Sequence, residues 1–493
     1  MASALDLLLV YPNNRARAYG SLADQIAAIT PPVGLGLIAA YVRKQGFSVQ
    51  LLDADAENLT AIATADEIVR RKPLLMLMAT DQLNSGDVTK MAAASDCMKA
   101  HHARGSGILT VMEGVSPSAY PERMLREENA DFAIQGEAYL PLVELLTELK
   151  AGRRYPSKPI EGIWWRAEDG SVVESRRPAL WKVPDELPMV PWDLLPMSKY
   201  RAHHWHCFDR LNARQPYAAI WTNLGCPYDC SFCSVNIVFG KPNYRARTAE
   251  NVVEEIDLLV NKYKISNLRI VDNIFTVQPD LVEKLCDLII ARGYDLNMWA
   301  YARVETVKDL NLAKKMRKAG VRWLAYGIEA ADAGVRKGVS KGSAGNVIDR
   351  AIEITKEADI NIVGNFIFGL PDDTHETMQA TLDMAKRYNF EYANFYFAMA
   401  YPGTELHELA RKEGIPLPDT WAGYGQYSED ALPMATKHLS AADIVRFRDQ
   451  AFIEYNTNPV YRNMMEKRFG PESVAFIDKI LSHKIRRKIL EKV

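Results

Sequence analysis

The chain lacks a strong charge of either sign and any long hydrophobic run. Its 60 Lys and Arg residues nearly balance its 62 Asp and Glu residues, so the formal net charge is −2. No global field therefore favours nucleic acid or an anionic membrane as a partner. The apolar stretch at 31–42 is too short for a membrane span and contains glycine and proline. An acid, Asp6, stands where a secretory signal would carry a cation, and we expect a cytoplasmic protein.

Cysteine is also scarce, with 6 residues in 493, but half of them lie together. Cys226, Cys230 and Cys233 follow a Cys-x3-Cys-x2-Cys spacing, which excludes a distributed disulfide framework and indicates a metal centre. Three thiolates on one loop can bind three irons of a [4Fe–4S] cluster and leave the fourth iron open to a small molecule. A zinc site is the alternative. It would need a fourth ligand, for which the upstream run supplies these candidates: His203, His204, His206 and Cys207.

The first 150 residues alternate short apolar runs with helical patterns. Strands are predicted at 5–10, 49–52, 74–79, 108–112 and 132–134, with helices between them. This order predicts an α/β domain with a doubly wound, Rossmann-like parallel sheet that binds its ligand at the carboxyl ends of the strands.

Residues 151–215 are rich in proline and predict a linker with a small hairpin turned at Asp169-Gly170. The alternation then resumes over 216–400, with strands predicted at 218–222, 268–271, 298–301, 323–326, 362–368 and 393–397. Six strand–helix units predict a partial, TIM-like (β/α)6 barrel. The cysteine loop directly follows its first strand, where barrel enzymes carry their chemistry. Residues 401–493 are predicted to be helical.

The loop Gly225-Cys-Pro-Tyr-Asp-Cys-Ser-Phe-Cys233 resembles that of the radical S-adenosylmethionine (SAM) enzymes, and the resemblance extends over about 218–400. It implies that the free iron chelates SAM and that reductive cleavage of SAM yields a 5′-deoxyadenosyl radical. The residues that it implies as SAM contacts are Phe232, Asp272, Asn273, Arg303, Glu329, Ile367 and Gly369. Asn365 and Ala330 stand where the family usually has glycine and serine.

A doubly wound domain ahead of such a barrel resembles the cobalamin-binding subfamily, which includes the class B methyltransferases and the anaerobic Mg-protoporphyrin cyclases. The stretches 31–37, 52–58 and 116–121 carry this resemblance. The implied cobalamin contacts are Pro12, Asp53, Asp55, Glu57, Thr80, Gly114, Ser116, Gly136 and Glu137. The chain has no Asp-x-His-x-x-Gly sequence, so the lower face of the corrin would be open, water-bound or covered by another side chain. The alternative is a vestigial domain without cobalamin.

The leading hypothesis is cobalamin-dependent methylation of an unactivated carbon, or phosphorus, of a small metabolite. Radical cyclisation, rearrangement or oxidation is the alternative within enzymes, and a non-catalytic corrinoid or cluster sensor is the alternative outside them. Methylthiolation is disfavoured because only Cys97 lies in the N-terminal part, where those enzymes need three more cysteines. An external electron donor of the flavodoxin or ferredoxin type is implied. Tyr301 and Tyr396 are predicted to line the barrel mouth and contact substrate.

Overall fold

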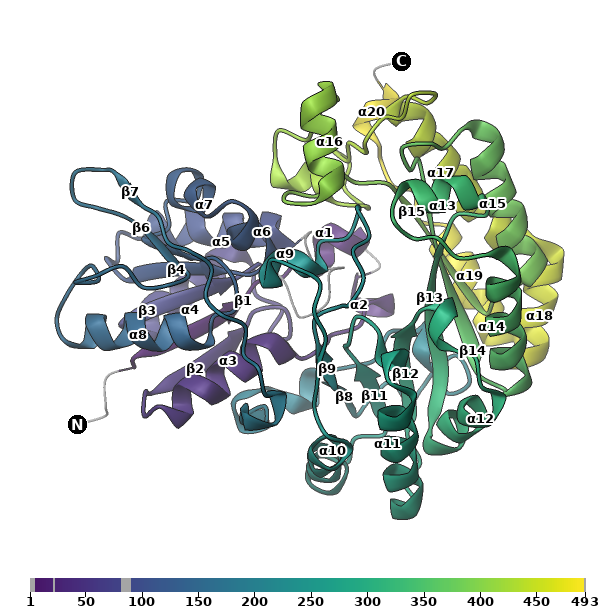
Figure 1. Cartoon of the computed structure of the whole chain (residues 1–493), viewed down its shortest axis with the longest axis horizontal. Coiled ribbons are helices and arrows are strands. Elements are labelled where there is room, and N and C mark those ends of the chain that lie inside the picture. The colour runs from purple at the N-terminus through teal and green to yellow at the C-terminus, as the bar shows by residue number, and fades with distance from the viewer. Residues whose placement is uncertain (1–4, 21–22, 81–89, 492–493) are drawn as a thin grey trace.

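The computed structural model describes residues 5–20, 23–80 and 90–491 and contains two large parallel sheets that lie beside one another (Figure 1). The first sheet has the order β2-β1-β3-β4-β5-β6-β7, in which β1 to β5 are parallel. These five strands are β1 Leu7–Tyr11, β2 Val49–Asp53, β3 Leu75–Ala79, β4 Leu109–Glu113 and β5 Phe132–Ile134. Every residue of β1 and β3 is buried, as in a parallel sheet that helices cover on both faces. The predicted doubly wound sheet is confirmed.

The helices of this part pack in pairs against the sheet, α3 with α8 and α4 with α5. The helices are α1 Arg15–Tyr19, α2 Ala23–Ile26, α3 Val33–Lys44, α4 Ala61–Arg71, α5 Met91–His102, α6 Val115–Ala119, α7 Pro121–Glu127 and α8 Tyr139–Lys150. The short helices α6 and α7 follow β4, so they lie near the carboxyl end of the sheet.

The predicted hairpin is present as β6 Ile163–Arg166 and β7 Val172–Val173. Gly170 adopts φ +82° at its turn, a backbone conformation that glycine adopts without strain. β6 pairs antiparallel with β5, so the hairpin extends the N-terminal sheet, whereas the sequence placed it in the linker. The domain boundaries at 150, 215 and 400 stay predictions. After the hairpin the chain runs through four 3₁₀ turns, Pro184–Glu186, Trp192–Leu194, Met197–Lys199 and Trp205–Cys207.

The second large sheet has six parallel strands in the order β15-β14-β13-β12-β11-β8. They are β8 Tyr217–Ile220, β11 Asn267–Ile270, β12 Asn297–Ala302, β13 Val321–Glu329, β14 Asn361–Phe368 and β15 Tyr392–Phe397. Each overlaps a predicted strand. β8 and β15 form the two edges and do not pair with each other, so the predicted partial barrel is confirmed. A separate two-stranded ribbon, β9 Asn223–Leu224 with β10 Arg245–Ala246, lies at the end of β8.

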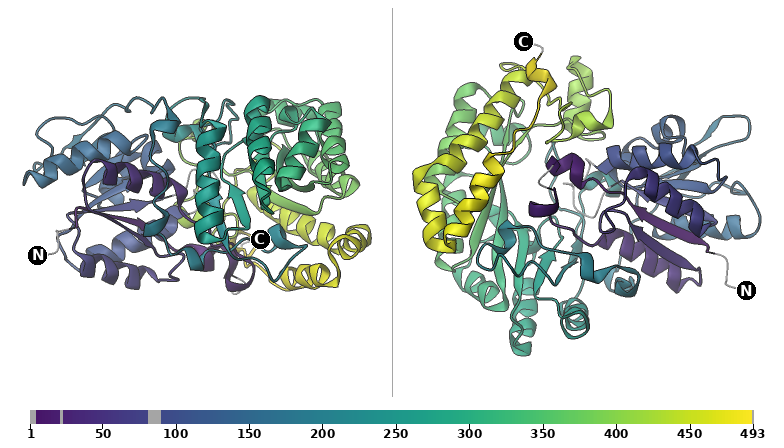
Figure 2. Two further views of the ribbon diagram at one scale, coloured as in Figure 1. Left: turned by 90° about the horizontal axis from the view of Figure 1, so that it is seen from below. Right: turned by 180° about the vertical axis from the view of Figure 1, so that it is seen from behind.

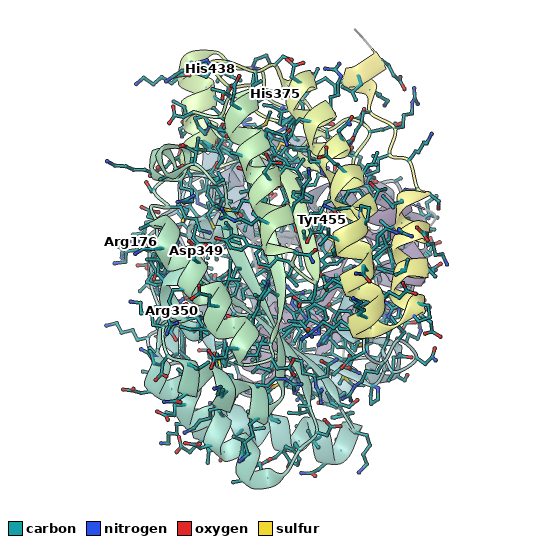
Figure 3. All side chains as sticks on the ribbon, turned by 90° about the vertical axis from the view of Figure 1, so that its right-hand side faces the viewer. Arg176, Asp349, Arg350, His375, His438 and Tyr455 are labelled. Atoms are coloured by element: carbon teal, nitrogen blue, oxygen red, sulfur yellow. The ribbon has the colours of Figure 1, made fainter. Side chains whose placement is uncertain are left out.

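Helices surround the convex side of this partial barrel (Figures 1 and 3). Those that follow its strands are α9 Val235–Phe239, α10 Ala249–Tyr263, α11 Pro279–Arg292, α12 Leu310–Ala319, α13 Ala333–Gly338, α14 Gly345–Glu357 and α15 His375–Tyr388. Three more short 3₁₀ turns are Phe275–Val277, Val304–Thr306 and Trp421–Tyr424.

The predicted helical C-terminal region is confirmed as α16 Glu405–Glu413, α17 Ala441–Thr457, α18 Pro459–Phe469, α19 Pro471–Leu481 and α20 Lys488–Glu491. Figure 2 shows α17 to α19 along the outside of the barrel, away from the N-terminal sheet. Tyr455 of α17 is fully buried and donates a hydrogen bond to the carbonyl of Phe390 at 2.8 Å, which ties this layer to the barrel. Within the described ranges, no helix has the length and apolar character that crossing a membrane requires.

The two sheets are joined by buried contacts. α6 of the N-terminal part packs against α9 of the barrel part. The Trp421 indole donates to Glu128 at 2.8 Å, and the Tyr120 hydroxyl lies 3.1 Å from Nδ1 of His407. Residues of the C-terminal region therefore rest on the N-terminal sheet's helices as well as on the barrel.

A buried charge pair holds the linker to the barrel. Arg247 and Glu255 are 2.7 Å apart and almost wholly buried, and the Trp192 indole donates to the same Glu255 carboxylate at 3.1 Å. Removing one partner of a buried pair leaves the other charge without compensation, which costs about 3–5 kcal/mol.

We expect Glu255→Ala to lower the free energy of unfolding by about 3–5 kcal/mol, because Arg247 would lose its buried counter-charge and the Trp192 N–H its acceptor. Urea unfolding followed by circular dichroism measures this. The exposed neighbour Glu254 provides the control, and Glu254→Ala should change stability by less than about 0.5 kcal/mol. Equal effects of the two substitutions would contradict the assignment.

Candidate active site

The cysteine loop lies between β9 and α9 at the carboxyl end of β8. Gly225 starts it with φ +84°, and a side chain there would collide with Asn243, whose backbone N–H donates to the Cys226 carbonyl at 2.9 Å. Within the loop the Cys233 N–H donates to the Cys230 carbonyl at 2.9 Å. These contacts curl the loop, so glycine at 225 is a steric requirement.

None of the three loop cysteines forms a disulfide. Cys226 is buried, Cys230 and Cys233 are partly buried, and burial raises the pKa of Cys226 and raises that of Cys233 to about 12. A guanidinium N–H of Arg303 lies 3.4 Å from the Cys230 sulfur. Metal binding must displace the thiol protons, and the nearby cation favours the anionic product.

The loop fits a cluster better than a single zinc ion. Among residues 5–20, 23–80 and 90–491, no three His, Cys, Asp or Glu side chains are arranged to hold one metal ion. Each thiolate of a [4Fe–4S] cluster binds a different iron, so its sulfurs need not converge on a point. His206 donates to the carbonyl of Asn297 at 3.0 Å and the Cys207 thiol to Asn267 at 3.4 Å, at the amino ends of β12 and β11. They therefore lie at the opposite end of the barrel from the loop.

Asp272, predicted to contact SAM, holds the base of the cysteine loop. Its carboxylate accepts hydrogen bonds from the backbone N–H of Thr222 at 2.7 Å and of Asn223 at 3.2 Å. It also accepts from the Asn223 amide at 2.7 Å and from the Thr222 hydroxyl. Burial raises its pKa to about 7 although these donors oppose the rise. Its neighbour Asn273 is half-buried at the same strand end. Contact of either residue with SAM stays a prediction.

Arg303 and Glu329 each have a partner that sequence reasoning missed. Arg303 makes a two-pronged ion pair with Glu305, with both N···O distances 3.1 Å, and its guanidinium lies 3.9 Å from the centre of the Tyr228 ring. Glu329 forms a buried ion pair with Lys341. It adopts φ +67° at an irregularity of β13, and a side chain at Gly327 would collide with both charged groups. No spacing in the sequence connects Lys341 to Glu329, because the pairing depends on the fold of the loop around α13.

Phe232 and Ile367, far apart in sequence, are brought together. Both pack against a small apolar cluster of Ala330, Leu370 and Ala398. Gly369 follows β14 with φ +77°, and its N–H donates to Asp373 at 3.0 Å. The structure thus gathers Phe232, Ile367 and Cys233 beside one cavity, as contacts to one ligand require.

The predicted cobalamin residues fall into two groups, and the first group is three carboxylates. Asp53 accepts from the Tyr200 hydroxyl at 2.8 Å, Glu57 pairs with Lys199, and Glu137 pairs with Arg245 at 3.0 Å. These three carboxylates bind neighbouring segments of the chain. Burial raises the pKa of Asp53 to about 7 and also raises that of Glu137.

The other predicted cobalamin residues form the carboxyl edge of the first sheet. The Thr80 hydroxyl donates to the Glu113 carbonyl at 3.0 Å, next to residues 81–89, which lie outside the described residues. Gly136, with φ +105°, donates its N–H to the Ser118 hydroxyl at 3.0 Å. Gly114, Gly136 and Glu137 line a small pocket of about 70 Å³, to which α9 also contributes residues. Ser116 is buried close by, and the Pro12 carbonyl is 3.4 Å from the Lys90 ammonium.

One cavity of about 440 Å³ lies between the two sheets and is lined by residues of both. Its N-terminal wall includes Tyr11, Arg15, Asp55 and Lys90, with Arg15 and Lys90 at 2.7 and 3.4 Å from the Asp55 carboxylate. Its barrel wall consists of residues from the cysteine loop and the strand interiors: Phe232, Cys233, Ser234, Tyr301, Ile367 and Tyr396. Ligand pockets are typically about 300–1,000 Å³, so this cavity is large enough to bind a small-molecule ligand.

The chain upstream of the barrel enters the same cavity. His203 and Trp205 line it, and the Trp205 ring meets the rings of Trp299 and Trp323 at centre distances of 5.1 and 5.3 Å. Burial lowers the pKa of His203 well below its usual value, so it is neutral. Arg269, which also lines the cavity, was not predicted as a site residue, and only the tertiary structure places it there.

The fold and site define an α/β enzyme in which a thiol-bearing partial barrel shares one cavity with a second, ligand-binding sheet. Residues 222–385 match the Radical SAM superfamily, and residues 21–146 match the B12 binding domain. The chain is 30% identical to an uncharacterized methyltransferase of Pyrococcus horikoshii, over 92% of this chain and 93% of the relative. The chain therefore belongs to the cobalamin-binding radical SAM enzymes, and its cofactors are a [4Fe–4S] cluster, SAM and cobalamin.

Two further relatives show how widely this architecture is used. The anaerobic magnesium-protoporphyrin IX monomethyl ester cyclase of Rubrivivax gelatinosus is 27% identical, over 82% of this chain and 69% of the cyclase. The radical SAM methyltransferase TsrM of Kitasatospora setae superposes with a TM-score of 0.63 over 83% of this chain and 75% of TsrM, at 20% identity. The second likeness shows the shared fold.

We expect Cys230→Ala to lose nearly all of the cluster's visible absorbance and iron after anaerobic reconstitution, because two thiolates hold the cluster poorly. Iron analysis and absorbance spectra measure this. Cys286→Ala, at a buried cysteine of α11 far along the chain, should keep about four irons per chain. Intact iron in the Cys230 variant would contradict the ligand assignment.

We expect Asp272→Ala to reduce reconstituted iron by roughly half or more, because the donors of Thr222 and Asn223 would lose their acceptor and the loop base would loosen. Iron content and the thermal midpoint are the measurements. Asp280→Ala, at an exposed acid of α11, is the matched control. Full iron content in the Asp272 variant would show that the loop does not depend on this carboxylate.

Proposed function

We propose that the protein is a methyltransferase that adds a methyl group to an unactivated carbon, or phosphorus, of a small metabolite. The observation that carries the proposal is the shared cavity. Residues that follow β1 and β2 and residues of the cysteine loop face the same space, so a ligand held by the first sheet and a ligand held at the cysteine loop would meet there. When bound, the cluster and SAM supply a hydrogen-abstracting radical and cobalamin supplies a methyl group.

The chain's own residues hold and orient the reactants. Cys226, Cys230 and Cys233 bind the cluster, and the cations Arg303 and Lys341 lie beside their loop. Phe232 and Ile367 offer apolar contacts to the adenine of SAM. The Glu329–Lys341 pair offers a buried donor and acceptor to its polar groups. At the other wall, Asp55 with Arg15 and Lys90 offers hydrogen bonds to the amides of a corrin ring.

Enclosure is the second contribution of the chain. Gln426 and Tyr427 of the C-terminal region line the cavity, and the contacts of this region with α6 and α7 cover it. Excluding water protects a carbon radical from side reactions. Reduction of the cluster is assigned to an external donor of the flavodoxin or ferredoxin type.

The test uses protein reconstituted anaerobically with iron, sulfide and cobalamin, then reduced and given SAM with a deuterated methyl group and a small-molecule extract. We expect corrinoid absorbance bands in the purified protein, formation of 5′-deoxyadenosine, and a product that has gained one deuterated methyl group. Absorbance spectra detect the bound corrinoid, and mass spectrometry identifies 5′-deoxyadenosine and the labelled product.

The controls separate methylation from other radical chemistry. Cys230→Ala protein and protein without cobalamin should form no labelled product. A product two hydrogens lighter and without label would instead indicate radical cyclisation or oxidation. Absence of both corrinoid bands and SAM cleavage in intact protein would refute the proposal.

A further inference from the structure

Arg269 places a guanidinium inside the partial barrel. It is the third residue of β11, beside Ala219 of β8 and Trp299 of β12 in the sheet register. Its side chain lines the shared cavity, and its guanidinium lies 4.7 Å from the centre of a Trp299 ring. The stacking holds the charged group in one orientation against the barrel wall.

This arginine has no counter-charge in the part of the chain that the structure describes. No carboxylate there lies within ion-pair distance of it, and its Nε is buried without a hydrogen-bond partner. Among the buried arginines, Arg247 pairs with Glu255 at 2.7 Å and Arg487 with Asp449 at 3.0 Å, and Arg336 donates to backbone carbonyls. Arg269 as a whole is half-buried, and leaving its buried Nε–H unsatisfied is costly, so a ligand that accepts from it would be stabilised.

The charges around the cavity also favour an anion. Its described lining carries three cations, Arg15, Lys90 and Arg269, and one carboxylate, Asp55. Arg15 and Lys90 share Asp55, which leaves Arg269 unneutralised. His203 also lines the cavity, and its ring carries no negative charge that could neutralise Arg269.

The wall around Arg269 is aromatic. Trp299 and Tyr301 of β12 and Tyr392 and Tyr396 of β15 line the cavity. Such rings pack well against a flat or apolar molecular body, and a planar guanidinium fits a carboxylate or phosphate with two parallel hydrogen bonds.

We propose that Arg269 binds the anionic group, a carboxylate or a phosphate, of a substrate whose apolar or aromatic body packs against these rings. The inference rests on the proposed function, because it treats the cavity as the substrate chamber. Arg269 stands three residues before Asp272, so it lies roughly 10 Å below the strand end that carries the cysteine loop. This depth assigns it to the substrate and leaves the rim of the barrel to SAM.

The experiment measures binding to the reconstituted holoenzyme in saturating SAM by calorimetry. The probes are 1-naphthoate, 1-naphthyl phosphate and the neutral 1-naphthamide, which share one aromatic body. We expect at least one anion to bind tenfold or more tightly than the amide, and the tighter of the two anions identifies the substrate's group. In Arg269→Gln the preference should fall to about twofold or less.

Arg350→Gln is the matched control. Arg350 lies on α14 in the outer helical layer and is largely exposed (Figure 3), so this variant should keep the anion preference. Arg269→Lys, which keeps the charge but loses the planar fork, should give an intermediate preference. If iron content or the thermal midpoint shows that the Arg269→Gln variant is misfolded, the Arg269→Lys variant takes its place in the comparison.

Three outcomes would overturn the proposal: no anion preference in the parent protein, an undiminished preference in Arg269→Gln, or anion binding that appears only when SAM is left out. The last would assign Arg269 to the carboxylate of SAM. Because binding is scored without turnover, a failure to methylate any substrate leaves this result intact, and the two proposals fail separately.

Discussion

The carboxylate of Asp272 connects the ends of two neighbouring barrel strands, and the position of the cysteine loop depends on it. It accepts from two consecutive backbone N–H groups and two side chains of Thr222 and Asn223, where β8 ends and the loop begins. A loop that binds a cluster through three cysteines needs a rigid base, and these hydrogen bonds fix the end of the loop that is joined to β8. Burial of Asp272 strengthens each of these hydrogen bonds.

The same loop joins the two halves of the molecule. α9, which begins two residues after Cys233, packs on α6 at the carboxyl edge of the first sheet. Parallel α/β structures bind ligands at the carboxyl ends of their strands. The contact between α9 and α6 lies at the carboxyl ends of both sheets. Bringing these two edges together produces one chamber, lined on one side by Tyr11 and Asp55 and on the other by Phe232 and Ile367. The chemistry of the protein follows from that contact more than from either sheet alone.

The predicted site residues divide by the kind of contact that they make. Cys226, Cys230 and Cys233 are neighbours along the chain, and their spacing alone brought them together. Phe232 and Ile367, which the family resemblance implied as contacts of the same ligand, pack against one apolar cluster, and their contact with SAM stays a prediction. Asp53, Glu57 and Glu137 pair with residues of the linker and barrel, which local sequence does not reveal.

The sequence by itself determined the elements: the apolar runs set the strands, the alternation with helices set two parallel sheets, and three cysteines on one turn set the cluster. These depend on short-range patterning and on spacing within a single loop. Only the tertiary structure decided which side chains share the cavity, the pairing of Glu329 with Lys341, and the position of an uncompensated Arg269 among aromatic rings. Such contacts join strands and loops far apart in sequence, and their geometry depends on how two sheets pack, which no local pattern encodes.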